Sequence, residues 1–241
     1  MIMRFPDRFA GKVALLTGSA ATLKNELMGF GGATVWRFLE EGGRGVVITD
    51  VQDDVGERAA AQLREEGYDA IYLHLDVTNE DEWNKAVSST IKHFGRIDIL
   101  VNIAGILDPK SILDIEPAVW KKTMEISTVG VFLGTRAVAK QMEKSGGGSI
   151  INLASMAAKQ GSGSYGSAYS FSRGGMHTLL NPQPCNFLVW ESVSTPSCRG
   201  GYTPRLRIIF TRTLNKVSIV PIVYRWAGGV SQKISLQASC F

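Results

Sequence analysis

The chain has 241 residues, of which 44% are hydrophobic and 20% charged, and its formal net charge is +4. This length accommodates one large domain with a core of α/β size. The longest apolar runs fall well short of the roughly 18 residues that a membrane span requires, which excludes a membrane-spanning protein. The stretch Met1–Phe9 carries charges and lacks the apolar centre of a secretory signal, so we expect a cytoplasmic protein.

The charge is unevenly distributed along the chain. Residues 1–176 contain 19 basic and 21 acidic side chains, whereas residues 177–241 contain seven basic ones and a single acid, Glu191. That final segment also holds all three cysteines, which fit no zinc pattern, and five of the eight prolines. A shifted reading frame or an aberrant splice would produce such a break near Met176, and a natural, divergent segment is the alternative. The basic residues form no amphipathic stripe, so we expect no nucleic-acid partner.

Strand-like and helical segments alternate through the first 180 residues. Short apolar runs predict buried strands at Lys12–Thr17, Val46–Asp50, Ala70–Leu75, Ile97–Asn102 and Ser149–Leu153. Helical spacing predicts helices at Gly31–Glu41, Asp53–Glu66, Asn79–Phe94, Trp120–Lys144 and Ala168–Leu180. Strands that alternate with helices of this length imply right-handed crossovers, and therefore an α/β fold with a doubly wound parallel sheet.

The alternation stops beyond residue 180. Prolines break any helix there, at Pro182, Pro184, Pro196 and Pro204. Arg207–Phe210 and Val217–Tyr224 are short candidate strands, but the sequence assigns no topology to them. We therefore expect a domain over residues 1–180 and an atypical, poorly ordered tail over residues 181–241.

A glycine-rich segment follows the first predicted strand. It consists of Thr17-Gly18, an intervening stretch Ala21–Met28, and Gly29-Phe30-Gly31 at the start of the next helix. Glycines at a helix N-terminus let backbone N–H groups approach a pyrophosphate, so this segment is a candidate nucleotide site. Asp50, followed by Val51, ends the second strand, where an acid accepts hydrogen bonds from the adenosine ribose and repels a 2′-phosphate. NAD is therefore favoured over NADP, with helix capping as the alternative role of Asp50.

Further motifs follow in order along the chain. They are Asp76-Val77 after the third strand, Asn102-Ile103-Ala104-Gly105 after the fourth, Gly130–Thr135 in the long helix, Ser155 after the fifth strand, and Tyr169 four residues before Arg173. From about Gly11 to Met176, this ordered set resembles the short-chain dehydrogenase/reductase family. The resemblance implies a Rossmann-type fold and hydride transfer between a nicotinamide cofactor and an alcohol or carbonyl.

The resemblance also implies a role for each matching residue. The diphosphate loop of the family is matched by Gly18, Gly29 and Gly31, with Thr17 and Phe30 beside them. The ribose site is matched by Asp50 and Val51, and the adenine pocket by Asp76 and Val77. The segment beneath the cofactor is matched by Asn102, Ala104 and Gly105. Ser155 matches the serine that hydrogen-bonds the reacting oxygen, and Tyr169 the general acid–base. Such a phenol needs a neighbouring cation to release its proton near neutral pH, and Tyr169 and Arg173 are also expected to contact the cofactor.

Several positions depart from the family's pattern. The glycine loop is longer than usual, and so is the spacing from Ser155 to Tyr169. Ile103 and Ser127 stand where the family has asparagines, and Arg173 stands where it has a lysine. Arginine keeps the positive charge but cannot pass a proton as an amine does. The sequence also contains no Pro-Gly dipeptide, which family members carry in a segment that closes over the nicotinamide.

Two functions remain open. The first is an NAD-dependent dehydrogenase for a small-molecule alcohol or ketone, with Ser155, Tyr169, Arg173 and Ser127 as its catalytic residues and no metal. The second is a non-catalytic nucleotide-binding or interaction protein descended from that family, which would bind a dinucleotide without turnover. The resemblance leaves the substrate open, includes members that are often dimers or tetramers, and implies that this tail lacks the usual last strands.

Overall fold

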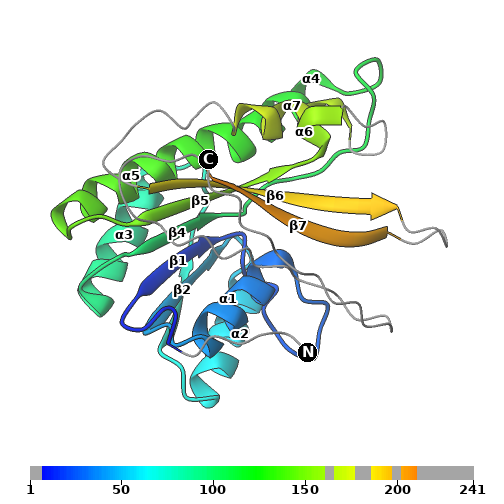
Figure 1. Ribbon diagram of the computed structural model, residues 1–241. Coiled ribbons are helices and arrows are strands. Elements are labelled where there is room, and N and C mark those ends of the chain that lie inside the picture. Colours follow the sequence, from blue (N-terminus) through cyan, green and yellow to red (C-terminus); the bar gives the residue numbers. More distant parts are fainter. Residues whose placement is uncertain (1–6, 161–165, 177–185, 197–201, 211–241) are drawn as a thin grey trace, which may run out of the picture.

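The computed structural model describes residues 7–160, 166–176, 186–196 and 202–210. These residues form one sheet in the strand order β3-β2-β1-β4-β5-β6-β7 (Figure 1). The strands are β1 (Val13–Thr17), β2 (Gly45–Asp50), β3 (Ala70–His74), β4 (Ile99–Asn102), β5 (Ser149–Ser155), β6 (Asn186–Pro196) and β7 (Tyr202–Phe210). Strands β1 to β6 are parallel, and β7 runs antiparallel to β6. The predicted α/β fold with a parallel sheet is confirmed.

Helices cover both faces of the sheet (Figure 1). Helices α1 (Phe30–Glu40) and α2 (Asp53–Glu65) lie on one face, and α3 (Glu80–Phe94) and α5 (Gly130–Lys144) lie on the other. Helix α4 (Pro117–Met124) precedes α5, and the short helices α6 (Ala157–Gln160) and α7 (Ser167–Gly175) follow β5. Across the described ranges, no helix combines the length and the apolar character that a membrane crossing requires.

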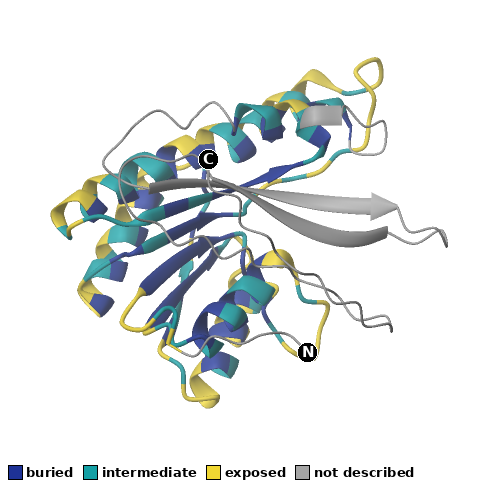
Figure 2. Cartoon of the chain, viewed as in Figure 1, coloured by how far each residue is buried: buried dark blue, intermediate teal, exposed yellow. Residues whose placement is uncertain are grey.

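Strand β1 contributes side chains to two separate hydrophobic cores. Val13 and Leu15 belong to the core beneath α3 and α5, whereas Ala14 and Leu16 belong to the core beneath α1 and α2. This division follows from the alternation of side chains along a strand. Figure 2 shows buried residues along the strands and on the sides of the helices that face the sheet. Coverage of both faces explains why the parallel strands read as continuous apolar runs.

The helix predicted at Trp120–Lys144 is confirmed as helical, and a π-helical segment interrupts its α-helical hydrogen-bond pattern. Helix α4 begins with Pro117, whose missing N–H suits a first helical turn. A π-helical segment, η1 (Glu125–Val129), follows, and α5 begins at Gly130. Apolar spacing cannot separate one π turn from an α turn, since the two differ by a single residue in hydrogen-bond register.

The other predicted elements before residue 176 are confirmed in type, and their described ends differ by one or two residues. The C-terminal part of the helix predicted at Ala168–Leu180 lies outside the described residues beyond Met176. Helix α6 has four residues and is too short to show a period, which is why the sequence did not predict it.

Two strands lie in the region to which the sequence assigned no topology. Strand β6 continues the parallel order beside β5, and β7 includes the candidate strand Arg207–Phe210. The candidate strand Val217–Tyr224 lies outside the described residues. A poorly ordered tail without the usual last strands stays a prediction, because residues 211–241 are not described.

Candidate active site

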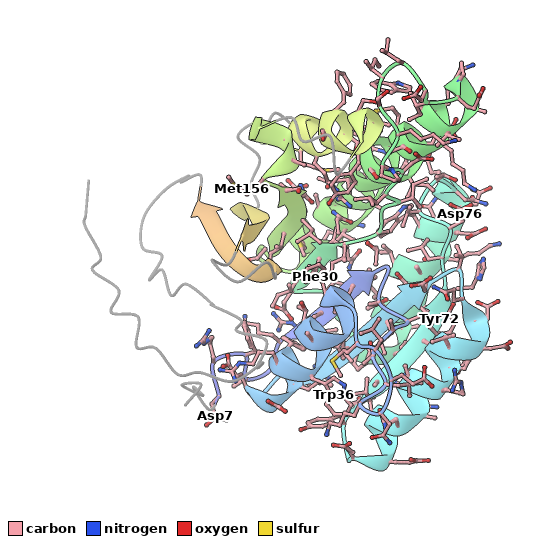
Figure 3. The ribbon with its side chains drawn as sticks, turned by 90° about the vertical axis from the view of Figure 1, so that its right-hand side faces the viewer. Asp7, Phe30, Trp36, Tyr72, Asp76 and Met156 are labelled. Atoms are coloured by element: carbon pink, nitrogen blue, oxygen red, sulfur yellow. The ribbon has the colours of Figure 1, made fainter. Side chains whose placement is uncertain are left out.

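The predicted cofactor residues converge on the carboxyl edge of the sheet. The chain passes from β1 to β2 through α1, on one face of the sheet. It passes from β3 to β4, which lies on the other side of β1, through α3 on the opposite face. The switch point therefore lies between β1 and β4, where a doubly wound sheet opens a crevice for ligands. Figure 3 looks toward this edge and labels Phe30, at the start of α1, and Asp76, which follows β3.

The three glycines of the loop have different structural roles. Gly18 has a φ of +61°, and a Cβ atom there would lie 2.8 Å from the Cα of Ala104. A Cβ on Gly31 would lie 2.7 Å from the Cα of Ser19, so this glycine permits close packing of the helix on the loop. A Cβ on Gly29, the N-cap of α1, would lie 3.6 Å from the Cβ of Ala21, which is ordinary van der Waals contact, so close packing does not require a glycine there.

The lengthened loop is folded against helices α1 and α2. Nε1 of Trp36 donates a 2.7 Å hydrogen bond to the main-chain oxygen of Thr22, and the N–H of Gly29 donates to Ala21 at 3.0 Å. The ammonium of Lys24 lies 3.9 Å from the centroid of the Trp36 ring and pairs with Glu66, the C-cap residue of α2. The additional residues are thus attached to the helices, and no side chain of the described residues caps the first turn of α1.

Asp50 ends β2 with a carboxylate fixed by the backbone around it. Its Oδ2 accepts a hydrogen bond from the N–H of Ala20 at 3.1 Å, and its Oδ1 accepts from Val51 at 2.8 Å and from Gln52 at 3.3 Å. A carboxylate has about four lone-pair positions, so acceptor capacity remains for further donors such as ribose hydroxyls. Helix capping contributes to this arrangement, since Gln52 is the N-cap residue of α2.

Asp76 and Val77 lie in the turn between β3 and α3. Oδ1 of Asp76 accepts hydrogen bonds from the N–H and the hydroxyl of Thr78, at 2.9 and 2.8 Å. Val77 is buried, and its side chain lies where a Cβ on Gly130 of α5 would be. The turn is therefore held from both sides, by α3 and by α5.

Thr17 connects the carboxyl ends of β1 and β4. Its buried hydroxyl accepts hydrogen bonds from the N–H groups of Ile103 at 3.0 Å and Ala104 at 3.2 Å. Asn102 donates from Nδ2 to Oδ1 of Asn152 at 2.8 Å, and the two residues are register partners in β4 and β5. Sequence reasoning missed Asn152, although its place in the apolar strand β5 marks it as an unusual buried polar residue.

The expected catalytic residues come from β5 and α7. Ser155 is the last residue of β5, is buried, and accepts a 3.2 Å hydrogen bond from the N–H of Ala157. Tyr169 lies in α7, which packs against β5 and the π-helical segment η1. The structure thus assigns Ser155 and Tyr169 to two elements in contact.

Arg173 lies one helical turn after Tyr169 and is buried, with 3% of its surface exposed. Its Nη1 donates a 2.7 Å hydrogen bond to the main-chain oxygen of Leu153, and its guanidinium carbon lies 5.1 Å from the centroid of the Tyr169 ring. Burial lowers the pKa of Arg173, against the opposing effects of its charge interaction and hydrogen bond with Tyr169. An arginine remains charged in such surroundings, so a cation lies beside the phenol.

Gly105 and Ser127 border the guanidinium of Arg173. A Cβ on Gly105 would collide with Nη2 of Arg173 and would lie 3.2 Å from Oγ of Ser127. Both Oγ of Ser127 and Nε of Arg173 are buried without a hydrogen-bond partner among the described residues. The structure therefore brings together three predicted site residues that lie far apart in the sequence.

These observations fit a dinucleotide. The first turn of α1, which follows Gly29 and has no acidic residue, suits a diphosphate. Asp50 suits a ribose, and the unpartnered polar atoms of Ser127 and Arg173 suit a polar group or water at the other end of the crevice.

The chain matches the short chain dehydrogenase family over residues 12–183. It is 38% identical over 150 residues to 2,5-dichloro-2,5-cyclohexadiene-1,4-diol dehydrogenase of Sphingobium indicum, covering 62% of this chain and 57% of that protein. It is 40% identical over 149 residues to cyclopentanol dehydrogenase of Comamonas testosteroni, covering 62% of this chain and 56% of that protein. It is also 40% identical over 149 residues to 3-alpha-(or 20-beta)-hydroxysteroid dehydrogenase of Mycobacterium tuberculosis, covering 62% of this chain and 53% of that protein.

A solved structure, NAD+-bound xylitol dehydrogenase, is similar in fold. It has a TM-score of 0.65 and 33% sequence identity, and the similarity covers 71% of this chain and 63% of that one. The chain thus spans little more than half the length of the curated relatives it matches. The matched residues include the glycine turn, the end of β2 and helix α7, in the order that the Rossmann-type sheet requires. On these grounds, the chain belongs to the short-chain dehydrogenase family.

Proposed function

We propose that this chain is an NAD-dependent dehydrogenase that interconverts a small-molecule alcohol and its ketone. The pairing of Tyr169 with Arg173 on α7, against the strand that ends in Ser155, carries this proposal. A phenol that accepts a proton becomes effective only when a cation stabilises its ionised form. The hydroxyl of Ser155 supplies a donor for the oxygen that gains charge during the reaction.

In alcohol oxidation, Tyr169 accepts the hydroxyl proton of the substrate and Ser155 donates a hydrogen bond to the same oxygen. Arg173, whose guanidinium carbon lies 5.1 Å from the centroid of the Tyr169 ring, supplies a positive charge beside the phenol during this transfer. Bound NAD would supply the hydride acceptor for the substrate carbon, so that the alcohol carbon could become a carbonyl. The reverse reaction returns the proton from Tyr169 to the carbonyl oxygen.

The residues that would hold NAD extend along the crevice. Gly29, Phe30 and Gly31 would face the diphosphate, Asp50 and Val51 the adenosine ribose, Asp76 and Val77 the adenine, and Asn102, Ala104 and Gly105 the nicotinamide half. The choice of NAD rests on the Asp50 carboxylate, which would repel a 2′-phosphate. The similar xylitol dehydrogenase structure, which is NAD+-bound, supports the nicotinamide cofactor.

Turnover of a cyclic secondary alcohol tests the proposal. The similar curated proteins are named for cyclopentanol, hydroxysteroids and a cyclohexadienediol, so cyclopentanol with NAD is the first substrate to assay. Tyr169→Phe should lower kcat by about 10²–10⁴-fold, the usual contribution of a general acid–base. Tyr68→Phe is the matched control, because Tyr68 packs on Trp36, in the core beneath α1 and α2 and away from α7. Equal turnover in wild type and Tyr169→Phe would overturn the assignment.

The second candidate is a dinucleotide-binding protein without turnover. Two observations favour it: the buried guanidinium of Arg173 is bound to Leu153, and Ser127 provides only a short, unpartnered hydroxyl. Calorimetric binding of NAD, with no turnover in wild type or in Arg173→Lys, would establish this alternative. Cytoplasmic location and homo-oligomerisation, which is common in the family, stay predictions.

A further inference from the structure

A hydrogen-bond network lies behind the candidate ribose site, between the ends of β2 and β3. Oη of Tyr72 lies 2.7 Å from the main-chain oxygen of Asp50 and 2.7 Å from Oδ1 of Asp53. Nδ1 of His74 lies 2.7 Å from the same Oδ1 atom. Asp50 and His74 are also register partners in these strands. The network therefore connects the turn that carries Asp50 to strand β3.

The other ring nitrogen of His74 is directed toward the candidate adenine site. Its Nε2 lies 3.7 Å from Oε2 of Glu82, and the same oxygen accepts a 2.6 Å hydrogen bond from the N–H of Asp76. Both ring nitrogens thus face carboxylates, and only the imidazolium has a donor for each. His74 lies between the turn of Asp50 and the turn of Asp76.

The charged groups that face His74 come from each neighbouring element. Asp53 belongs to α2, Glu82 to α3, and Asp76 to the turn between β3 and α3. The hydrogen bond with Asp53 is the largest cause that raises the pKa of His74; burial opposes it, and the charges of all three acids add to it. The imidazolium therefore persists to a higher pH than in an isolated histidine, and it is lost as the pH rises through the raised pKa.

Burial and packing hold the Tyr72 ring in place, and its hydroxyl remains a hydrogen-bond donor in this network. It is 8% exposed, and a Cβ on Gly56 of α2 would overlap its ring. Burial is the largest cause that raises the pKa of Tyr72, and the hydrogen bond with Asp53 adds to it. The hydroxyl thus keeps its proton, and the position of Asp53 relative to Asp50 is fixed.

We propose that His74 is a specificity-determining residue for the dinucleotide, an inference that rests on the proposed function. As an imidazolium, His74 offsets the negative charge of Asp53, whose carboxylate lies 2.7 Å from the same Tyr72 hydroxyl as the main-chain oxygen of Asp50. When His74 is neutral, the carboxylates of Asp50 and Asp53 repel a 2′-phosphate more strongly. NAD carries no such phosphate, so the preference for NAD over NADP increases as His74 loses its proton.

Calorimetry on the full chain tests this inference, with NAD and NADP titrated at about pH 6.5, 7.5 and 8.5 and constant ionic strength. His74→Asn is the test variant, since the Asn amide can replace the Nδ1 donor to Asp53 but cannot titrate. His93→Gln is the matched control, because His93 forms a similar exposed pair with Asp69, 3.1 Å away at the far end of α3. The 2′-phosphate titrates in the same way with each variant, so the comparison between variants isolates His74.

The ratio of Kd for NADP to Kd for NAD should rise with pH in wild type and in His74→Asn. The rise should be about fivefold larger in wild type, because one charge near a phosphate has an effect of this size in a partly solvated site. His93→Gln should follow wild type. Coincident profiles of wild type and His74→Asn, or an equal effect of His93→Gln, would overturn this inference alone. Absence of binding of either dinucleotide to any variant would overturn the proposed function together with it.

A second measurement requires no dinucleotide. The ring signals of His74, followed by NMR against pH, should titrate above the ordinary range of histidine, and Asp53→Asn should lower the midpoint. An unchanged midpoint in Asp53→Asn would show that the pair does not control the charge of His74, which would also overturn the inference.

Discussion

Nη1 of Arg173 donates a 2.7 Å hydrogen bond to the main-chain oxygen of Leu153, two residues before Ser155 in β5. This bond holds the guanidinium against the strand that carries the serine, while the same group interacts with Tyr169 on α7. The cation, the phenol and the serine are therefore positioned by one contact between a helix and a strand.

We expect Arg173→Lys to raise alcohol oxidation about tenfold, equivalent to about 1.4 kcal/mol of barrier. The flexible ammonium of lysine is not tied to a planar fork of donors, so it can leave Leu153 and approach the Tyr169 hydroxyl. Arg173→Met removes the charge and should reduce turnover below that of wild type. Measured kcat/KM with NAD and cyclopentanol checks both variants, and a lysine variant no faster than wild type would contradict the prediction.

Gly18→Ala should destabilise the protein by about 3 kcal/mol, which combines the left-handed backbone with overlap against Ala104. Gly67→Ala separates these two causes. Gly67 has a φ of +88° but no atom within 4 Å of its Cβ position, so its cost should be about 1 kcal/mol. Urea unfolding of both variants measures the difference, and equal losses would refute the close approach of Ala104.

Gly56→Ala should cost about 2 kcal/mol, because the new methyl group displaces the Tyr72 ring. Gly174→Ala is the control within a helix, since no atom lies within 4 Å of its Cβ position, and it should stabilise by about 0.5–1 kcal/mol. Urea unfolding checks both signs. NAD binding should weaken in Gly56→Ala, and full affinity there would argue against a role of Tyr72 in holding Asp50.

The stability of the protein should depend on Asp98 under acidic conditions. Burial alone raises the pKa of Asp98, but hydrogen bonds from Arg96 and from the N–H of Val13, with the charges of Arg96 and Lys12, lower it below its ordinary value of 3.8. The stabilisation is present above that value and is lost as the pH falls through the lowered pKa.

Asp98→Asn removes this titration. At neutral pH, the variant should be about 2 kcal/mol less stable than wild type, the usual cost of lost charged hydrogen bonds. The difference should shrink as the pH falls from 3.8 through the lowered pKa of the folded protein, where the wild-type carboxyl takes up its proton. Urea unfolding at several pH values tests this, and a constant difference would exclude Asp98 as the titrating group.

The parts of the structure that follow from local pattern were predictable. The apolar runs of β1 and β2 predict buried strands, and the acid at the end of β2 follows from its place after such a run. The sequence also places Ser155 after the fifth predicted strand and Tyr169 in the next predicted helix, while their roles come from the family resemblance. Each of these inferences uses residues that are near neighbours in the sequence.

The remaining features depend on contacts between distant residues. The π-helical segment around Ser127 has the apolar spacing of an ordinary helix, so no local signal marks it. The network of Tyr72, Asp53 and His74 joins two elements whose hydrogen bonds appear only after folding. Trp36 shows the same limit, because nothing in its helix predicts that its indole binds the main chain of Thr22.

The strand β1, which both cores share, also determines how the protein unfolds. Val13 and Leu15 stabilise one helical layer while Ala14 and Leu16 stabilise the other, so neither layer can detach without uncovering a strand on which the opposite layer depends. Heating should therefore melt the layers around β1 cooperatively, and amide exchange in β1 should report global unfolding rather than local opening.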